Sequence, residues 1–294
     1  MPKPNITMLA AGSGLLALVF GGAACGSHGT SSRDTNPAKV RLGSATSIVA
    51  LNDPVTSGPT APPAPTTLPP ILAPQPGTAK VIGSAASPDG VALAFDDGFC
   101  DKCVGNLVSA VERTGAHVTF CPNGAYGGVW SHYAERIKVL IAKGQVSICN
   151  HTFSHKKLTT LSTTAIRDEL QRNEDWIEQT FGISSRPYFR PPGGSYNGQV
   201  LAVAGELGFT QVVNWSITLS DSSLQPQSHI TDVIRRCSQP GAIVLGHANY
   251  APTGEVFDQL IQILTSKHLR TVTVHELLAR DVRGDPPPSA GACA

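Results

Sequence analysis

Five side chains that can act as acids, bases or metal ligands each follow a short apolar run of the sequence. Asp96 and Asp97 come after one run, His151 and His155 after a second, and His247 after a third. Paired carboxylates at the end of a strand suggest metal binding or acid-base chemistry, and two imidazoles four residues apart are a spacing found in metal sites. Asp96 or Asp97 is available as a base, and His247 adds a third titratable imidazole.

Each of these signals also has a structural explanation. Asp-Asp-Gly is a common turn sequence, a histidine four places after another arises by chance, and His247 alone fits a neutral core histidine. The spacing of His151 and His155 predicts two imidazoles on one face of a helical turn. The residues between them lack the glutamate of the zinc-protease motif, so a base has to come from the aspartate pair.

A fourth polar site is Arg190, the one guanidinium in a stiff loop of proline and glycine at 189–196. A surface turn is its structural explanation. Gly98 allows the chain to turn after the aspartate pair, so that both carboxylates face the same side. Four polar sites at four strand ends are hard to ascribe to chance, and this favours a functional centre.

The elements that must position these residues alternate along the chain. Helix patterns end at Gly115, Gly144 and Gly182, the usual residue type at a helix C-terminus. Alternating strands and helices predict parallel strands with crossover helices. About 195 residues are too few for a full eight-unit barrel of ~250, so we expect an α/β fold, an incomplete (β/α) barrel with its site at the strand C-termini. The predicted strands are 91–97, 117–121, 145–149, 210–215, 242–246 and 270–274.

Composition limits the function class and the size of the domain. The chain has 294 residues and a net charge of +1, which argues against nucleic-acid binding. Of its 17 aromatic residues, 16 lie between Phe95 and Phe257, so one large domain is expected there. We predict a signal peptide at 1–25, a disordered proline-rich tether at 26–85, a catalytic domain at 86–284 and a flexible tail at 285–294.

The N-terminal segment determines where the protein is expected to act. Its apolar run at 8–20 is typical of an export signal, with a transmembrane anchor as the alternative. The residues before Cys25 resemble a bacterial lipobox, so Cys25 is a candidate for lipidation. We expect an exported monomer, secreted to the cell envelope or anchored as a lipoprotein, which contacts the membrane only through its lipid anchor or signal segment.

Five ordered motifs together resemble a known family. They are AFDDG, HTFSH, RPPGGSY, a segment from Trp215 to Asp221, and LGH. This order is similar to that of the polysaccharide deacetylases with a NodB-type domain, carbohydrate esterase family 4, over about residues 88–282. The resemblance implies these roles: metal ligands Asp97, His151 and His155, the base Asp96 oriented by Arg190, and the acid His247 oriented by Asp221.

The chain departs from the family pattern around the substrate. Thr218 and Ser222 replace an aspartate and a tryptophan of the fourth motif, and Gly193 stands where an aromatic residue is usual. Because the backbone N–H of that residue serves the oxyanion in the family, glycine suffices there, but the acetyl pocket and sugar groove lose aromatic walls. The expected oxyanion and substrate loop comprises Gly193, Gly194 and Tyr196, and the expected pocket comprises Trp215 and Leu245.

The family resemblance implies a metal-dependent N-deacetylase. The expected ion is Zn²⁺, with Co²⁺ or Ni²⁺ also compatible, and the expected substrate is peptidoglycan, with N-acetylglucosamine or N-acetylmuramic acid as the acetylated sugar. The enzymatic alternatives are an O-acetyl xylan deacetylase and a chitin-oligomer deacetylase. The non-enzymatic alternative is a glycan-binding or structural envelope protein, because fold does not fix function.

Seven cysteines in a chain with an export signal favour disulfides. Without Cys25 six remain, enough for three bridges. The strands that end at Cys121 and Cys149 are consecutive and expected to be adjacent, which predicts a bond between these two residues. For Cys100 and Cys103 a structural role is favoured over a redox motif, because they follow the Asp-Asp-Gly turn rather than begin a thioredoxin-like unit.

Overall fold

The computed structural model describes residues 75–279 and residue 293. The predictions of a signal peptide, a lipidated Cys25 and most of the tether fall outside these residues, as does most of the predicted tail. Over the described ranges, no helix combines the length and the apolar character needed to cross a membrane.

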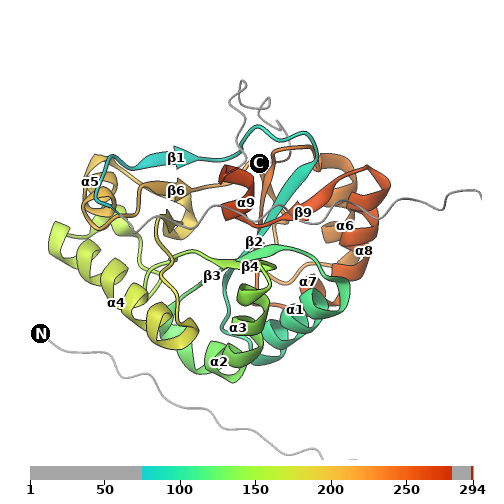
Figure 1. Ribbon diagram of the computed structural model, residues 1–294, viewed down its shortest axis with the longest axis horizontal. Helices are drawn as coiled ribbons and strands as arrows, with labels where there is room; N and C mark the ends of the chain where they lie inside the picture. The colour runs from blue at the N-terminus through green and yellow to red at the C-terminus, as the bar shows by residue number, and fades with distance from the viewer. Residues whose placement is uncertain (1–74, 280–292, 294) are drawn as a thin grey trace, which may run out of the picture. The chain divides into compact units, whose positions relative to one another are not determined.

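A six-stranded parallel sheet forms the larger part of the fold (Figure 1). Its central strand β2 pairs with β3 and β8 and, through its first three residues, with β9. All eight residues of β2 are buried, as expected for a parallel strand covered on both faces. The strands are β2 (Gly90–Asp97), β3 (Val118–Pro122), β4 (Val146–Ile148), β7 (Ile217–Thr218), β8 (Ile243–His247) and β9 (Arg270–Val272).

A second sheet of three parallel strands continues the curve of the first. It consists of β1 (Lys80–Ile82), β6 (Gln211–Val213) and β5 (Tyr188–Phe189), in that order. A parallel bridge between Asn150 and Phe189 joins it to the end of β4, where the Arg190 N–H donates to the Asn150 carbonyl at 2.8 Å. The two sheets thus form an incomplete parallel barrel, as the sequence predicted.

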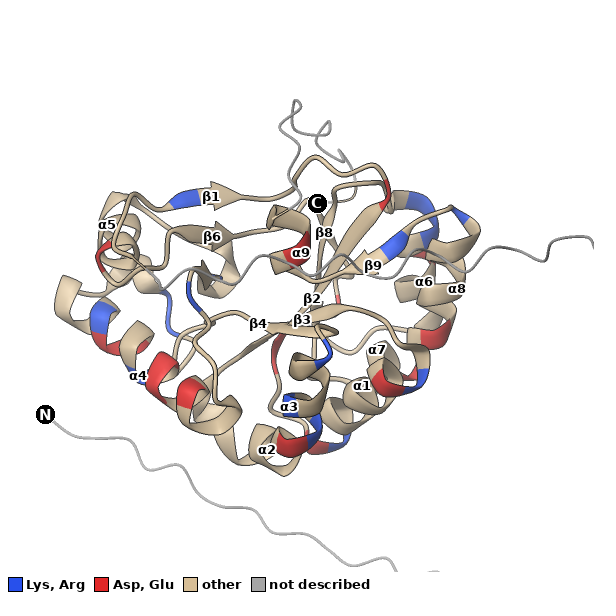
Figure 2. Ribbon diagram, in the orientation of Figure 1, with Lys and Arg blue, Asp and Glu red and all other residues tan. Residues whose placement is uncertain are grey.

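Helices surround the strands, and several begin and end where the sequence indicates. Gly115 and Gly182 end α1 and α4 in the left-handed conformation, with φ of 70° and 74°. Figure 2 shows acidic and basic residues intermingled along the outer helices, with no face of one sign in this view. The helices are α1 (Asp101–Thr114), α2 (Gly127–His132), α3 (Ala134–Ala142), α4 (Thr163–Phe181), α5 (Gly198–Glu206), α6 (Gln227–Cys237), α7 (Ala251–Glu255), α8 (Phe257–Ser266) and α9 (Val274–Ala279).

Side chains of β2 alternate between two hydrophobic clusters. Val91, Leu93 and Phe95 pack in the large cluster with residues of α1, α3 and α8. Ala92 and Ala94 belong to a separate cluster with the cysteines of β3 and β4 and with Val213 of β6. Because strand side chains alternate with a period of two, Asp96 lies on the same face as the two alanines. The pleat of β2 therefore aims this carboxylate between the two sheets.

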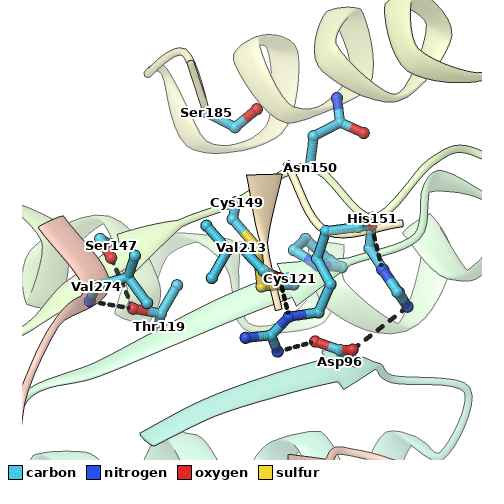
Figure 3. The surroundings of a disulfide bond; sticks show 12 residues. Asp96, Thr119, Cys121, Ser147, Cys149, Asn150, His151, Ser185, Val213 and Val274 are labelled. Carbon is cyan, nitrogen blue, oxygen red and sulfur yellow. Dashed lines mark hydrogen bonds and ion pairs between the residues drawn. A yellow bond between two sulfur atoms is a disulfide. The ribbon is translucent and has the colours of Figure 1, made fainter. Parts of the chain in front are cut away.

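Three disulfides occur in the described chain. Cys121 and Cys149 are bonded with Cα atoms 4.6 Å apart, which confirms the predicted link between β3 and the end of β4. Figure 3 shows this bond beside Val213, with Asp96 and His151 joined nearby. The other two bonds are Cys100–Cys103 and Cys237–Cys293.

Two predicted boundaries differ from the structure. The tether was expected to reach residue 85, but β1 pairs in register with β6, and the carbonyl of Ile82 accepts from the Asn214 N–H at 2.8 Å. Backbone pairing fixes this segment although its composition is polar and proline-rich. At the other end, Cys293 of the predicted tail is bonded to Cys237 at the end of α6.

Candidate active site

The turn after β2 is fixed by backbone conformation and by one tryptophan. Asp97 and Gly98 both have positive φ, 68° and 98°. A Cβ on Gly98 would lie 2.4 Å from the indole nitrogen of Trp130, so only glycine fits there. The same indole N–H donates to the carbonyl of Asp97 at 2.8 Å. Left-handed backbone at an aspartate is uncommon and is maintained here by these contacts.

The carboxylate of Asp97 has one bonded and one unpartnered oxygen. Its Oδ2 accepts from the side-chain amide of Asn249 at 2.8 Å, and the carbonyl oxygen of that amide accepts from the Gly98 N–H at 3.0 Å. Its Oδ1 is buried and has no hydrogen-bond partner in the described chain. This oxygen lies 3.6 Å from His151 Nε2 and 3.5 Å from His155 Nε2.

The orientation of His151 is fixed from its other nitrogen. His151 Nδ1 lies 2.8 Å from the carbonyl oxygen of Arg190. A carbonyl can only accept, so Nδ1 carries the proton and the lone pair of Nε2 in the neutral ring faces Asp97. This arrangement is typical of a histidine that binds a metal through Nε2.

The two histidines lie on a loop and not on the predicted helical turn. Thr152 and His155 have positive φ, 66° and 56°, which no helix permits. Hydrogen bonds from both the hydroxyl and the N–H of Ser154 to the buried carboxylate of Glu169 on α4 hold the loop. The rings still approach, with centroids 5.0 Å apart, because the loop folds back on itself.

Asp97, His151 and His155 fit a divalent cation. One donor atom from each lies within 4.8 Å of the others, and the unpartnered Asp97 Oδ1 is the atom that such an ion would satisfy. Burial, followed by the nearby charge of His151, lowers the pKa of His155, which favours the neutral imidazole that a metal requires. Two imidazoles and one carboxylate are compatible with a catalytic site of Zn²⁺.

Asp96 is paired with a fully buried arginine. Arg190 Nη1 donates to Asp96 Oδ1 at 2.7 Å, and its Nε donates to the carbonyl of Val213 on β6 at 2.8 Å. The second carboxylate oxygen of Asp96 lies 3.5 Å from His151 Nε2. The guanidinium compensates the charge of Asp96. It also binds one carboxylate oxygen and so leaves the other oxygen facing His151.

His247 lies at the end of β8 against a buried carboxylate. Its Nδ1 is 2.9 Å from Asp221 Oδ1, while Asp221 Oδ2 accepts from the His247 N–H and from the hydroxyl of Thr253. Burial lowers the pKa of this histidine, but the hydrogen bond to Asp221 and the charges of Asp96, Asp221 and Asp97 outweigh burial, so its pKa is raised. The charged imidazolium is therefore favoured.

One cavity of about 350 Å³ brings these groups together. Its walls include the predicted pocket residues Trp215 and Leu245, the predicted oxyanion residue Gly193, and Ser222. Gly194 and Tyr196 are not among the described residues that line it. The N–H of Gly194 instead donates to the Pro191 carbonyl at 2.8 Å.

Three residues of the cavity were not identified from the sequence. Asn249 orients Asp97, and Phe99 and Tyr126 form part of the wall. Phe99 directly follows the Asp-Asp-Gly turn, and this adjacency was the one available signal. Asn249 and Tyr126 carry no pattern that points to the site, because their role depends on contacts made in the folded chain.

Comparison with known proteins gives a family match. The family profile described as polysaccharide deacetylase matches residues 83–212. The peptidoglycan-N-acetylmuramic acid deacetylase PdaA of Bacillus subtilis is 26% identical over 189 residues, 63% of this chain and 70% of that protein. The match covers less than two thirds of other curated relatives: 64% of an uncharacterized 30.6 kDa protein of Geobacillus stearothermophilus and 46% of YlxY of Bacillus subtilis.

Solved structures show the same fold. A variant, with restored enzymatic activity, of a carbohydrate esterase family 4 pseudoenzyme from Bacillus anthracis has a TM-score of 0.60 at 25% identity, covering 70% of this chain and 72% of that one. The match of motifs, profile and structure is consistent along the domain. The described domain is a polysaccharide deacetylase domain of the NodB type, with the fold of carbohydrate esterase family 4, a family of hydrolases.

Proposed function

We propose that this protein is a metal-dependent hydrolase that removes N-acetyl groups from amino sugars of a cell-envelope polysaccharide, with peptidoglycan as its substrate. One observation carries the proposal. A single cavity holds an Asp-His-His ligand set, a carboxylate paired with a buried arginine and an imidazole bonded to a buried carboxylate. These are the parts that hydrolysis of an acetamide requires.

Asp97, His151 and His155 hold the ion, for which we propose Zn²⁺. When bound, the ion supplies a Lewis acid that makes water more acidic and polarises an acyl oxygen. Asp96 is the general base that takes a proton from the attacking water. Arg190 positions it, since it binds one carboxylate oxygen and leaves the other toward the ligands.

His247 completes the reaction on the side of the leaving group. Water adds its oxygen to the acetamide carbon, the C–N bond breaks, and the amine nitrogen takes a proton from the imidazolium. The hydrogen bond to Asp221 holds the ring and favours its charged form. The Gly193 N–H at the cavity wall is our candidate donor to the oxyanion. The products are a free amino sugar and acetate.

The choice of an N-acetylated glycan rests on the relatives. Besides PdaA, they include a chitooligosaccharide deacetylase of Bradyrhizobium at 27% identity over 173 residues, which is 59% of this chain and 77% of that protein. Both names describe removal of acetyl groups from amino sugars of polysaccharides. An exported protein meets peptidoglycan first, and this favours peptidoglycan over chitin oligomers.

Export to the cell envelope is part of the proposal. The apolar N-terminal run and the lipobox-like sequence before Cys25 support it. The three disulfides support it independently, because such bonds persist in oxidising compartments. Fractionation of cells that express the full chain, followed by detection of the protein in the envelope or the medium, tests this point.

Acetate release from a panel of peptidoglycan, chitin oligomers and acetylxylan tests the activity. We expect release from peptidoglycan that requires added Zn²⁺ and is lost in the Asp96→Asn variant. Release from acetylxylan alone would make the protein an esterase. Binding of glycans without acetate release from any substrate would favour a non-catalytic role; one of the similar solved structures is a carbohydrate esterase family 4 pseudoenzyme from Bacillus anthracis.

A further inference from the structure

An exposed aromatic ring lies at the edge of the catalytic cavity. Phe99 is 46% exposed, one of a few large apolar side chains in the described chain that face water, and it also lines the cavity. It is two residues from Asp97. An exposed phenylalanine lacks the stabilisation that burial of its apolar surface would give. Its position beside the reacting groups therefore suggests that a ligand covers it.

Neighbouring rings and backbone contacts hold Phe99 in place. Tyr126 and Tyr250 pack against it nearly at right angles, with centroids 5.9 and 5.8 Å away and interplanar angles of 68° and 88°. Its N–H lies 3.4 Å from Asn249 Oδ1, and the disulfide of Cys100 with Cys103 follows directly. Edge-to-face contacts stabilise aromatic rings, so this ring is ordered before any ligand arrives.

The chemistry of this wall matches a sugar ring. A pyranose has apolar C–H faces and polar hydroxyls around its edge. Phe99 offers an apolar ring face, and Tyr126, which also lines the cavity, adds a hydroxyl group that can exchange hydrogen bonds. Phe99, Tyr126 and Tyr250 include no acidic or basic residue, which fits a neutral glycan better than a charged ligand.

The aromatic wall also compensates for the changed motifs. Ser222 and Gly193, which stand where the family has aromatic residues, both line the cavity without a ring of their own. Trp215 and Phe99 come from different strand ends, after β6 and β2. Aromatic surface is therefore provided by residues outside the third motif and outside the altered position of the fourth.

We propose that Phe99, braced by Tyr126 and Tyr250, is a sugar-binding subsite for the pyranose that adjoins the acetylated residue in a polysaccharide chain. This inference rests on the proposed function and specifies the part of the substrate that the protein recognises. The protein should then prefer substrates of more than one sugar, because binding of the neighbouring pyranose helps to position the acetamide.

The test compares two ligands that differ only in chain length. In an Asp96→Asn background, which prevents turnover, binding of N,N′,N″,N‴-tetraacetylchitotetraose and of N-acetylglucosamine is measured by calorimetry with Zn²⁺ present. We expect Phe99→Ala to weaken tetramer binding about tenfold, within the range for loss of a buried aromatic contact, and to leave monomer binding unchanged. Phe99→Tyr should restore tetramer binding.

Val139→Ala is the matched control, because Val139 is 53% exposed on α3 and does not line the cavity. It should bind both ligands like the parent, and thermal unfolding should show that all variants are folded. Equal tetramer affinity in the parent and Phe99→Ala would overturn the subsite, as would equal loss for tetramer and monomer. If Phe99 determines tetramer binding but the active enzyme releases no acetate, the proposed function fails while the subsite stands.

Discussion

The proposed metal ligands and the proposed proton-transfer groups share one cavity but are held in different ways. Asp97 and His151 are oriented by neutral partners, the amide of Asn249 and the carbonyl of Arg190. Asp96 and His247 are each bonded to a side chain that carries charge, Arg190 and Asp221. The neutral partners determine only the orientation of Asp97 and His151, whereas the charged partner of His247 also raises its pKa.

Substitutions in these two groups of contacts should therefore have different effects. Changes among the neutral contacts should alter how tightly the ion is bound. Changes among the charged pairs should alter rate or pH dependence while the ion stays in place. Variants of the two groups test whether metal binding and proton transfer can be disturbed independently.

The largest effect is expected for the imidazole ligands. His151→Ala and His155→Ala each leave two protein donors from a set of three, so we expect both to lose bound Zn²⁺ and all measurable acetate release. Metal content after dialysis, measured by mass spectrometry, checks this. His268→Asn, an exposed histidine with positive φ outside the site, is the control and should retain the metal. Stoichiometric zinc in both alanine variants would exclude this site.

The second prediction concerns the base. Asp96→Asn keeps the shape of the side chain but removes its ability to take a proton, so kcat should fall by roughly two or more orders of magnitude. Zn²⁺ content should equal that of the parent, because Asp96 is not one of the three donors. Loss of the metal together with the activity would show that Asp96 is a metal ligand. The distinction between metal ligands and proton-transfer groups would then fail.

Much of the framework could be predicted because its strands are long and apolar. Strands β2, β3 and β8 were found from runs of four to eight buried residues. By contrast β5 and β7 have two residues each, too few for any periodicity to show. β1 lies in a polar and proline-rich stretch, and its pairing with β6 depends on residues some 130 positions away.

The same distinction applies to the site. Asp97 and His247 end strands that the sequence indicated and His151 follows another, so their convergence could be predicted from strand polarity. The loop conformation of the two histidines could not, since it depends on Glu169 and on left-handed backbone at Thr152. Asn249 reaches Asp97 across 152 positions of sequence, and no local pattern records such a contact.

Asn249 gives the third prediction. Asn249→Ala removes the hydrogen bond to Asp97 Oδ2 and the acceptor for Gly98 N–H, so the carboxylate is no longer oriented. Zn²⁺ affinity should fall about 10- to 100-fold, the range for loss of a residue that orients a ligand. Competition with a chelator of known affinity measures this. Ser222→Ala, which changes the cavity wall but no ligand contact, is the control. Unchanged affinity in Asn249→Ala would show that the turn alone positions Asp97.

The smallest expected effect is a displacement in pH. The proposed acid His247 can donate a proton only when it is protonated, so activity should fall as pH rises through its pKa, and a raised pKa should place this alkaline limb at higher pH. Asp221→Asn removes the carboxylate that opposes the effect of burial, so the pKa should drop and the limb should move about one pH unit lower. The profile of kcat/KM against pH measures the displacement. Thr253→Val keeps the carboxylate and should leave the limb in place. An unmoved limb in Asp221→Asn would mean that a group other than His247 donates the proton.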